Sequence, residues 1–323
     1  MIITRTPFRV SFAGGGSDLR DYYNQRPYGA VVSAAIQSYM YIIIHPYFHD
    51  KIRIKYSKTE DAESVEEIKH PIVREVLRKV AVDKGIEIAS FADVPAGTGL
   101  GSSSSFTVGL LHALYAYKGE KVDKEKLAQE ACDIEIEILK EPIGKQDQYA
   151  AAFGGLNYIR FNQDESVKIA PISLEQGGLA KLSEKLKLYY VGGNRSASNI
   201  LSQQKSNLKD KNKLAQLDKM VSLADDLRGS FHEWKVEHLA KNLHKGWQYK
   251  QELATGIGNK HVEELMEKAV QLGAKGGKLL GAGGTGFLLI YADNHEEITA
   301  KLGCRSLPFS IDKDGSKVIS SLR

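Results

Sequence analysis

A chain of 323 residues with 42% apolar and 26% charged residues is long enough for about two domains, and this composition excludes wholesale disorder. Its 44 Lys and Arg residues and 40 Asp and Glu residues leave a formal charge of +4 without a clustered basic stripe, so we expect no nucleic-acid partner. No apolar run reaches the roughly 20 residues of a membrane helix, and residues 1–9 lack a signal-peptide pattern, so we expect a cytoplasmic protein without a membrane partner.

The first half of the chain is predicted to be rich in strands before it turns helical. Apolar runs of strand length occupy residues 2–6, 8–12, 29–33, 39–46, 51–56, 86–91, 156–161 and 167–172, and one helix is expected near 71–84. From Ser102 the apolar residues recur at helical spacing, and Gly119 should end that helix. A second helix is predicted from its N-cap Asp123 to Lys140, because Pro142 cannot continue it.

Gly177 and Gly178, followed by a polar helix, indicate a domain boundary. Beyond them the pattern predicts strands at 186–191, 278–280, 287–291 and 305–309, several helices between 196 and 272, and a short helix at 296–302. No repeat of 20 to 50 residues is visible, which argues against a solenoid or propeller.

The strongest motif is the segment Pro95–Ser105, with the sequence PAGTGLGSSSS, which follows a predicted strand and opens a predicted helix. Gly97, Gly99 and Gly101 let the backbone approach a ligand, and the start of the following helix favours an anion such as phosphate. One cap needs one hydroxyl, so four serines favour phosphate or metal ligands over a simple capped loop. The motif lacks the features of Walker and Rossmann loops, so a different nucleotide loop is indicated.

A second glycine cluster, at residues 276–286, contains a formal GxGxxG pattern at Gly281, Gly283 and Gly286. A predicted strand follows this pattern instead of a helix, so the dinucleotide-binding interpretation fails on context. Two interpretations remain open: a connection that passes close to a ligand or another backbone, and a plain β-hairpin.

Polar residues that could carry chemistry also occur on the loop after the second predicted strand. Glycines 14–16 place Ser17 and Asp18 on this loop, where polar residues are often functional. An Asx-type turn is the alternative explanation for Asp18.

Two carboxylates further along the chain are candidates for metal binding or catalysis. On the second predicted helix Glu135 falls about 70° from the centre of the apolar stripe, at the margin of the buried face. A carboxylate in that position needs a partner, and Mg²⁺ would suit it. Asp147 opens what the pattern predicts as another helix, so it is either a functional carboxylate or an N-cap.

Taken together and in this order, these motifs resemble those of the GHMP kinases, which include galactokinase, homoserine kinase and mevalonate kinase. Residues 6–18 and 144–149 are most similar to the D-glycero-D-manno-heptose 7-phosphate kinases within that family. The resemblance implies an α+β fold with two domains, an N-terminal ATP-binding domain at 1–182 and a ferredoxin-like C-terminal domain at 183–323. The active site would lie in the cleft between them.

The resemblance also implies roles for the residues that match the family motifs. The ATP phosphates would be cradled by the loop residues Pro95, Gly97, Gly99, Leu100, Gly101, Ser102, Ser103 and Ser104. Ser103 and Glu135 would bind Mg²⁺, although four serines in a row leave the register open by one. Asp147 would be the general base or orienting carboxylate for the acceptor hydroxyl, and Arg9 would be the cation that keeps it ionised.

Substrate contacts are implied for the first loop and for the second glycine cluster. The expected residues are Gly15, Gly16, Ser17, Asp18, Gly283 and Gly284. Galactokinases carry Glu-His where this chain has Gly15-Gly16, which argues against galactose and leaves room for a larger or phosphorylated sugar. Arg195 is our hypothesis for a clamp on the sugar phosphate, because a guanidinium matches phosphate oxygens in pairs, with a surface salt bridge as the alternative.

The activity implied is ATP- and Mg²⁺-dependent phosphorylation of the anomeric hydroxyl of D-glycero-D-manno-heptose 7-phosphate, a step toward a nucleotide-activated heptose. The alternatives are a kinase of an unphosphorylated sugar, such as fucose or a uronic acid, and a catalytically silent nucleotide- or sugar-binding regulator. The expected partners are ATP and the sugar phosphate, and a homodimer is compatible with the sequence.

Overall fold

The computed structural model describes residues 1–192, 197–233 and 236–321, and its larger sheet is built around two long strands, β1 (Ile2–Ala13) and β2 (Tyr28–Pro46). The strands are antiparallel, and their register shifts between Pro7 and Phe8 and again between Ser11 and Ala13. Such irregularities bend a strand without ending it. The predicted strands 2–6 and 8–12 are therefore one strand, and so are 29–33 and 39–46.

The two halves of β2 pair with different neighbours. Its first half pairs with β6 (Leu156–Asn162), and its second half pairs with β5 (Ile86–Ala92). The other strands of this sheet are β3 (Ile52–Lys55), β4 (Thr59–Ala62), β7 (Val167–Pro171) and β12 (Lys317–Ser321). The main path runs β12-β1-β2-β5-β3-β4, while β6 and β7 extend it from β2.

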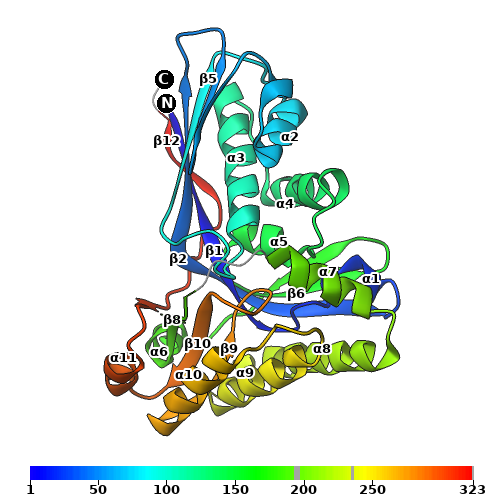
Figure 1. The fold of residues 1–323 in the computed structure, drawn as a ribbon, viewed down its shortest axis with the longest axis vertical. Coiled ribbons are helices and arrows are strands. Elements are labelled where there is room, and N and C mark those ends of the chain that lie inside the picture. Colours follow the sequence, from blue (N-terminus) through cyan, green and yellow to red (C-terminus); the bar gives the residue numbers. More distant parts are fainter. Residues whose placement is uncertain (193–196, 234–235, 322–323) are drawn as a thin grey trace.

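Helices cover one face of this sheet (Figure 1). They are α2 (Pro71–Val80), α3 (Ser102–Lys118), α4 (Lys124–Cys132) with its π-helical continuation η2 (Asp133–Ile138), and α5 (Gln146–Phe153). The short elements α1 (Arg20–Tyr23) and η1 (Val65–Glu67) lie in loops. Gly119 ends α3 in the left-handed conformation with φ +77°, and Asp123 caps α4 through Lys126 N, as the sequence predicted.

The second sheet has four antiparallel strands in the order β11-β8-β10-β9. These strands are β8 (Leu186–Tyr190), β9 (Ala274–Leu279), β10 (Phe287–Ala292) and β11 (Ser306–Pro308). The helices of this half are α6 (Gly178–Lys185), α7 (Ala197–Asn207), α8 (Lys211–His232), α9 (Val236–Gln251), α10 (Lys260–Gln271) and α11 (Glu296–Leu302). Helices between the first and second strands and between the third and fourth give the ferredoxin-like connection, so the predicted α+β class is confirmed.

The last strand, β12, returns to the first sheet. Ile2 pairs with Ser321 and Arg5 pairs with Lys317, so the two ends of the chain lie side by side (Figure 1). The sequence analysis predicted no strand there. The division of the chain at residue 182 stays a prediction, and β12 belongs by hydrogen bonding to the sheet formed by the first half.

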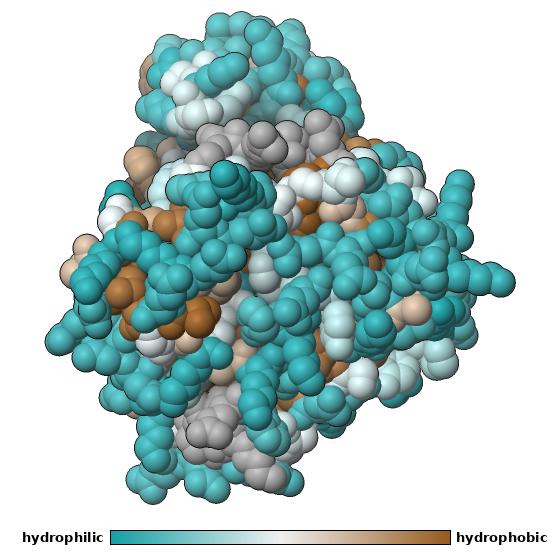
Figure 2. Space-filling model, turned by 60° about the horizontal axis from the view of Figure 1, so that its bottom comes forward, coloured by the Kyte–Doolittle hydropathy of each residue, from teal (hydrophilic) through white to brown (hydrophobic). Residues whose placement is uncertain are grey.

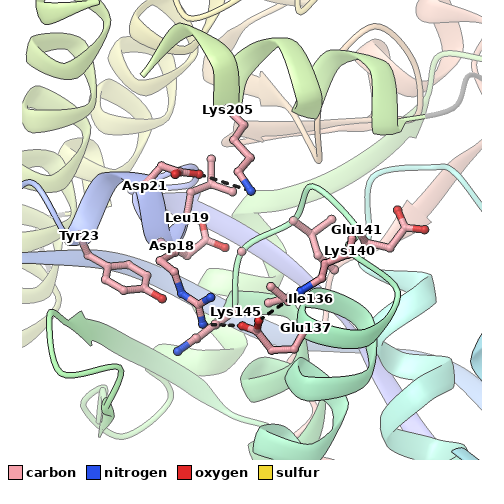
Figure 3. Close-up of a pocket in the computed structure, with 13 residues that line it drawn as sticks. Asp18, Leu19, Asp21, Tyr23, Ile136, Glu137, Lys140, Glu141, Lys145 and Lys205 are labelled. Carbon is pink, nitrogen blue, oxygen red and sulfur yellow. Dashed lines mark hydrogen bonds and ion pairs between the residues drawn. The ribbon is translucent and has the colours of Figure 1, made fainter. Parts of the chain in front are cut away.

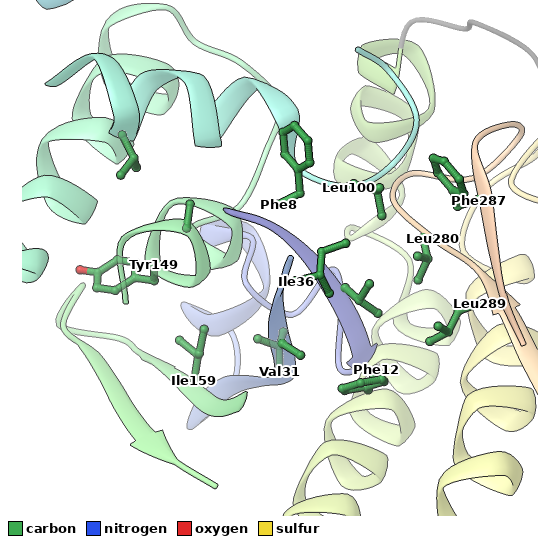
Figure 4. Packing of buried hydrophobic residues seen from close by; sticks show 14 of the residues in the cluster. Phe8, Phe12, Val31, Ile36, Leu100, Tyr149, Ile159, Leu280, Phe287 and Leu289 are labelled. Carbon is green, nitrogen blue, oxygen red and sulfur yellow. The ribbon is translucent and has the colours of Figure 1, made fainter. Parts of the chain in front are cut away.

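Apolar packing joins the two halves at the end of β1. Phe12 lies against Phe231 of α8 and Phe309, with ring centroids 6.3 Å and 5.9 Å away. Figure 4 shows this ring beside the helices of the second half, with Leu280 and Leu289 nearby. Burying a ring of this size stabilises the fold by about 1.5–3 kcal/mol. The loop that follows β1 is therefore held where both halves meet.

The outer surface is mainly hydrophilic on the face drawn in Figure 2, where apolar side chains form separate patches. No helix of the described residues is both long and apolar enough to cross a bilayer.

Candidate active site

The glycine-rich loop of Pro95–Ser105 connects β5 to α3 with three glycines in the left-handed region. Gly97, Gly99 and Gly101 have φ of +75°, +83° and +76°, which other residues adopt only with strain. A Cβ on Gly101 would lie 3.1 Å from the Asp147 Oδ2 atom, and one on Gly99 would lie 2.6 Å from the Leu280 carbonyl oxygen. The glycines thus let the loop contact a carboxylate on one side and the second glycine cluster on the other.

Arg9 of β1 and Asp147 of α5 meet beneath this loop in a two-pronged ion pair. Arg9 Nε lies 2.6 Å from Asp147 Oδ1, and Arg9 Nη2 lies 2.6 Å from Oδ2. The third nitrogen, Nη1, donates to the Gly99 carbonyl oxygen at 2.6 Å. Asp147 does not cap α5, whose N-cap is Lys145. Its carboxylate is instead held by a guanidinium that also binds the glycine-rich loop.

Glu135 is completely buried and faces the start of α3. Ser103 Oγ donates to Glu135 Oε1 at 2.5 Å, and Gln148 Nε2 donates to Oε2 at 2.7 Å. Burial raises the pKa of Glu135 to about 7, although these hydrogen bonds oppose the shift. The sequence placed Glu135 at the margin of an α-helical face. The structure buries it because the chain turns π-helical here, with Leu139 N bonded to Ile134 O at 2.9 Å, and π-turns often mark functional sites.

Oxygen atoms of Ser103 and Glu135 are of the kind that Mg²⁺ prefers, and a buried carboxylate with a raised pKa gains from a cation. The described residues contain no cluster of three or more His, Cys, Asp or Glu side chains that could hold a metal by themselves. Mg²⁺ commonly takes one or two protein ligands and completes its shell with phosphate oxygens and water, so the pair fits the ion. Ser105 is engaged elsewhere, since its Oγ donates to the Pro7 carbonyl oxygen at 2.8 Å.

Asp18 is buried on the loop that follows β1. Its Oδ1 accepts a hydrogen bond from Gly16 N at 2.9 Å, and its Oδ2 accepts one from Gln146 N at 3.3 Å. Burial, and then the negative charge of Asp147, raise the pKa of Asp18. A Cβ on Gly144 would lie only 2.1 Å from Asp18 Oδ2, so this glycine leaves room for the carboxylate.

A cavity of about 350 Å³ brings together residues from six segments of the chain. Among the predicted site residues it is lined by Arg9, Gly15, Gly16, Asp18, Gly97, Gly99, Gly101, Ser102, Ser103, Ser104 and Asp147. Glu135 lies behind Ser103, one hydrogen bond away from the cavity wall. The first loop, the glycine-rich loop and the segment of Asp147 therefore all reach one cavity, with Glu135 directly behind its wall.

The other predicted residues have different positions. Five of them do not line this cavity: Ser17, Pro95, Leu100, Gly283 and Gly284. Ser17 is buried, and its Oγ exchanges hydrogen bonds of 3.0 Å with the backbone of Ala30, which anchors the first loop to β2. Arg195 lies outside the described residues.

The second glycine cluster passes close to another backbone. A Cβ on Gly281 would lie 2.3 Å from Gly99 Cα, and one on Gly283 would lie 2.6 Å from the Ile257 carbonyl oxygen. Both glycines also have positive φ. Of the two interpretations left open by the sequence, close approach to a backbone is the one that the structure supports.

The cavity is also lined by residues to which the sequence analysis assigned no role. Among them are Ser11, Gln204, Lys250 and Lys278. Lys278 lies within the second glycine cluster. A charged residue directly before an apolar run was the signal that could have marked it as a site residue. Lys250 and Gln204 lie in polar helices, whose patterns do not distinguish a buried polar residue from an exposed one.

A smaller pocket of about 150 Å³ shares Asp18, Leu19, Glu141, Ile143 and Gly144 with the main cavity. Figure 3 shows Lys205 reaching from α7 toward Asp21, and the carboxylate of Glu137 near Lys140. Cationic side chains of this outer pocket thus face carboxylates.

Comparison with known proteins finds two family models on this chain. The GHMP kinases N terminal domain matches residues 67–155, and the GHMP kinases C terminal domain matches residues 231–308. D-glycero-alpha-D-manno-heptose 7-phosphate kinase of Campylobacter jejuni is 28% identical over 98% of both chains. Galactokinase of Pyrococcus furiosus is 26% identical, over 92% of this chain and 91% of that one.

Solved structures agree on the fold. The crystal structure of a D-glycero-D-manno-heptose 1-phosphate kinase from Bacteroides thetaiotaomicron superposes with a TM-score of 0.82 over 100% of both chains, at 24% identity. Mevalonate kinase of Methanococcus jannaschii superposes with a TM-score of 0.74, at 19% identity over 96% of this chain and 98% of that one.

Proposed function

Because this chain belongs to the GHMP kinase family, we propose that it transfers the γ-phosphoryl group of Mg·ATP to the anomeric hydroxyl of D-glycero-D-manno-heptose 7-phosphate, giving the 1,7-bisphosphate. The observation that carries this proposal is the cavity in which the glycine-rich loop, Asp147 and Asp18 meet. The similarity to a heptose 7-phosphate kinase over nearly the whole chain supports the choice of substrate. The product would feed the reactions that make a nucleotide-activated heptose.

The glycine-rich loop would hold the ATP phosphates. Helix α3 begins at Ser102, and the helix dipole and the unpaired N–H groups of its first turn favour negative charge there. Two hydrogen bonds from Arg9 hold the loop in place. Its guanidinium donates to the Gly99 carbonyl oxygen, and its backbone N–H donates to the Leu100 carbonyl oxygen at 3.0 Å. Phosphoryl transfer depends mainly on such positioning and on neutralising charge.

Asp147 would orient the acceptor hydroxyl and take up its proton as the new O–P bond forms and the bond to the ADP oxygen breaks. The two hydrogen bonds from Arg9 fix the plane of the Asp147 carboxylate. They therefore also fix its position relative to the glycine-rich loop. Asp18 would hold a sugar hydroxyl close to Asp147, since it lines the same cavity and accepts a hydrogen bond from Gln146 N at 3.3 Å.

Mg²⁺ would be held by Ser103 and Glu135 together with ATP. When bound, the ion neutralises charge on the phosphate oxygens. Ser103 already donates to Glu135, so both oxygen ligands are positioned at the end of the glycine-rich loop.

A kinase of an unphosphorylated sugar is the second candidate. L-fucokinase/L-fucose-1-P guanylyltransferase of Bacteroides fragilis is 29% identical over 64% of this chain, although that match covers only 22% of the longer relative. A catalytically silent regulator is disfavoured by Asp147 and Arg9, whose buried ion pair opens into the cavity.

The test is ADP release from Mg·ATP by the purified protein with heptose 7-phosphate, mannose, fucose, galactose or glucuronate. We expect release only with heptose 7-phosphate, and phosphorus NMR should place the new phosphate on the anomeric carbon. The Asp147→Asn variant, prepared in the same way, controls for contaminating ATPase. Release only with a free sugar would overturn the heptose phosphate proposal, and no release with any sugar would favour a regulator.

A further inference from the structure

Two buried lysines line the cavity without a carboxylate partner in the described part of the chain. Lys250 of α9 is 7% exposed and Lys278 of β9 is 2% exposed. Their ammonium groups donate to backbone carbonyl oxygens only: Lys250 Nζ to Gly281, and Lys278 Nζ to Phe12 at 3.2 Å. A buried cation without a counter-ion is costly, so such a pair indicates a site that an anion completes.

Burial leaves a clear electrostatic signature on both lysines. It lowers the pKa of Lys250 to about 8; the positive charge of Arg9 adds to this shift, and the negative charges of Asp18 and Asp147 oppose it. Burial also lowers the pKa of Lys278, and there the charge of Lys250 adds to it. The two ammonium groups are therefore close enough to repel each other electrostatically.

Neighbouring cations are already neutralised. Arg9 is held by both oxygens of Asp147. In the outer pocket, Lys205 faces Asp21 at 3.4 Å (Figure 3). Lys145 of the same pocket is paired with Glu165. Among the described residues, Lys250 and Lys278 are therefore the lysines of the main cavity that no carboxylate pairs.

Two more polar groups of the cavity lining lack partners among the described residues. They are Gln204 Nε2 and Ser11 Oγ, which are both buried. A Cβ on Gly16 would lie 2.5 Å from Gln204 Nε2, and one on Gly15 would lie 3.4 Å from Ser11 Oγ. An amide N–H and a hydroxyl that lie against the first loop can each donate to an anion.

We propose that Lys250 and Lys278, together with Gln204 and Ser11, form the subsite for the phosphate group that the acceptor sugar already carries. The inference rests on the proposed function and names the residues that select a phosphorylated substrate. A phosphate ester carries up to two negative charges and several acceptor oxygens, which match two ammonium groups, one amide and one hydroxyl.

The position of this subsite favours the acceptor over ATP. Gln204 and Ser11 lie against Gly16 and Gly15 of the first loop, and Lys278 binds the carbonyl oxygen at Phe12, where β1 leads into that loop. The glycine-rich loop and α3 provide a separate anion site of their own.

The test compares Lys250→Met and Lys278→Met with Lys205→Met, a control from the outer pocket whose charge is already paired. Both buried variants should raise the KM for heptose 7-phosphate about tenfold or more, with the KM for ATP and for the unphosphorylated heptose changed less than about twofold. The Lys205→Met variant should behave as wild type. A KM for ATP that rises as much as that for the sugar phosphate would overturn the proposal and assign the lysines to the transferred phosphoryl group.

Thermal unfolding with inorganic phosphate tests the same subsite without catalysis. Phosphate should raise the Tm of the wild type and of Lys205→Met more than that of Lys250→Met and Lys278→Met, in which the glycine-rich loop can still bind the anion. Gln204→Leu serves if a lysine variant does not fold, and it should weaken the phosphate effect. If the wild type phosphorylates no sugar phosphate but phosphate still protects it through the lysines, the proposed function fails while the anion subsite stands. Equal protection of all variants would overturn the subsite.

Discussion

Arg9 and Asp147 are 138 residues apart in the sequence, yet two hydrogen bonds of 2.6 Å join the guanidinium of one to the carboxylate of the other. The same guanidinium binds the carbonyl oxygen of Gly99. One arginine therefore links the proposed catalytic carboxylate to the loop proposed to hold the phosphates. A shift of either group would be transmitted to the other.

Removing the charge of Asp147 should stop the chemistry and spare nucleotide binding. We expect Asp147→Asn to lower kcat roughly 10²- to 10⁴-fold, the usual contribution of a positioned acid or base. The Kd for ATP, measured by calorimetry, should change little, because the loop that would bind the phosphates is intact. The control is Asp50→Asn, whose side chain is 86% exposed, and it should retain full activity. An unchanged kcat would remove Asp147 from the mechanism.

Two serine variants distinguish the proposed metal ligand from a structural hydroxyl. Ser103→Ala should raise the Mg²⁺ concentration needed for half-maximal activity, because the hydroxyl beside Glu135 is lost. Ser105→Ala should lower Tm and leave the Mg²⁺ requirement as it is, since the Ser105 hydroxyl bonds only the Pro7 carbonyl oxygen. If Ser105→Ala raised the Mg²⁺ requirement and Ser103→Ala did not, Ser105 would be the metal ligand.

Glu135→Gln offers a complementary test. A neutral amide of similar size still accepts the bond from Ser103, and its NH2 group can donate to the oxygen of Gln148 once that amide turns over. The change also removes the cost of burying a charge, so Tm should stay the same or rise. Activity should need about tenfold or more Mg²⁺. A fall in Tm with an unchanged Mg²⁺ titration would make Glu135 a purely structural residue.

The contact between the two glycine loops can be isolated by a matched pair of substitutions. Gly177→Ala and Gly281→Ala both place a side chain at positive φ, which costs about 1–3 kcal/mol. The Cβ at 177 meets no atom within 4 Å, whereas the Cβ at 281 would meet Gly99 Cα at 2.3 Å. We therefore expect urea unfolding to show a loss about 1–3 kcal/mol larger for Gly281→Ala, with a higher KM for ATP. Equal losses of stability in the two variants would mean that the contact between Gly281 and Gly99 does not stabilise the fold.

Lys250 predicts how substrate binding depends on pH. Its ammonium faces Arg9, Asp18, Asp147 and Lys278, and burial lowers its pKa to about 8. It is charged below that pH, so the KM for the sugar phosphate should be constant at neutral pH and rise above pH 8. The unfolded chain keeps its proton up to a pKa of about 10.5, so the stability of the free protein should increase between pH 8 and 10.5.

The control for this pH dependence is Lys250→Met, which should lose both effects. Its KM for the sugar phosphate should be high at every pH, without a rise above pH 8. If the KM of the variant rose above pH 8 as it does in the wild type, a group other than Lys250 would cause that rise.

Local sequence patterns determined most elements and the positions of the functional loops. The helix at 102–118 ends at Gly119, and the helix at 124–132 starts at its N-cap Asp123, because these ends depend on residues next to each other in the chain. The glycines of residues 97–101 were predicted to let the backbone approach a ligand, and the structure adds that all three have positive φ. The family resemblance then assigned Arg9 and Asp147 their roles, and the comparisons confirmed the family.

Tertiary structure decided what depends on distant partners. The strand β12 exists because β1 offers it a free edge, although its own five residues carry little signal. Glu135 is buried because a π-turn rotates it away from its α-helical position. Lys250 and Lys278 look like surface lysines in the sequence, and only the packing of the second half against β1 encloses them. Periodicity reports which residues share a face of one element, whereas burial and charge pairing depend on which elements meet.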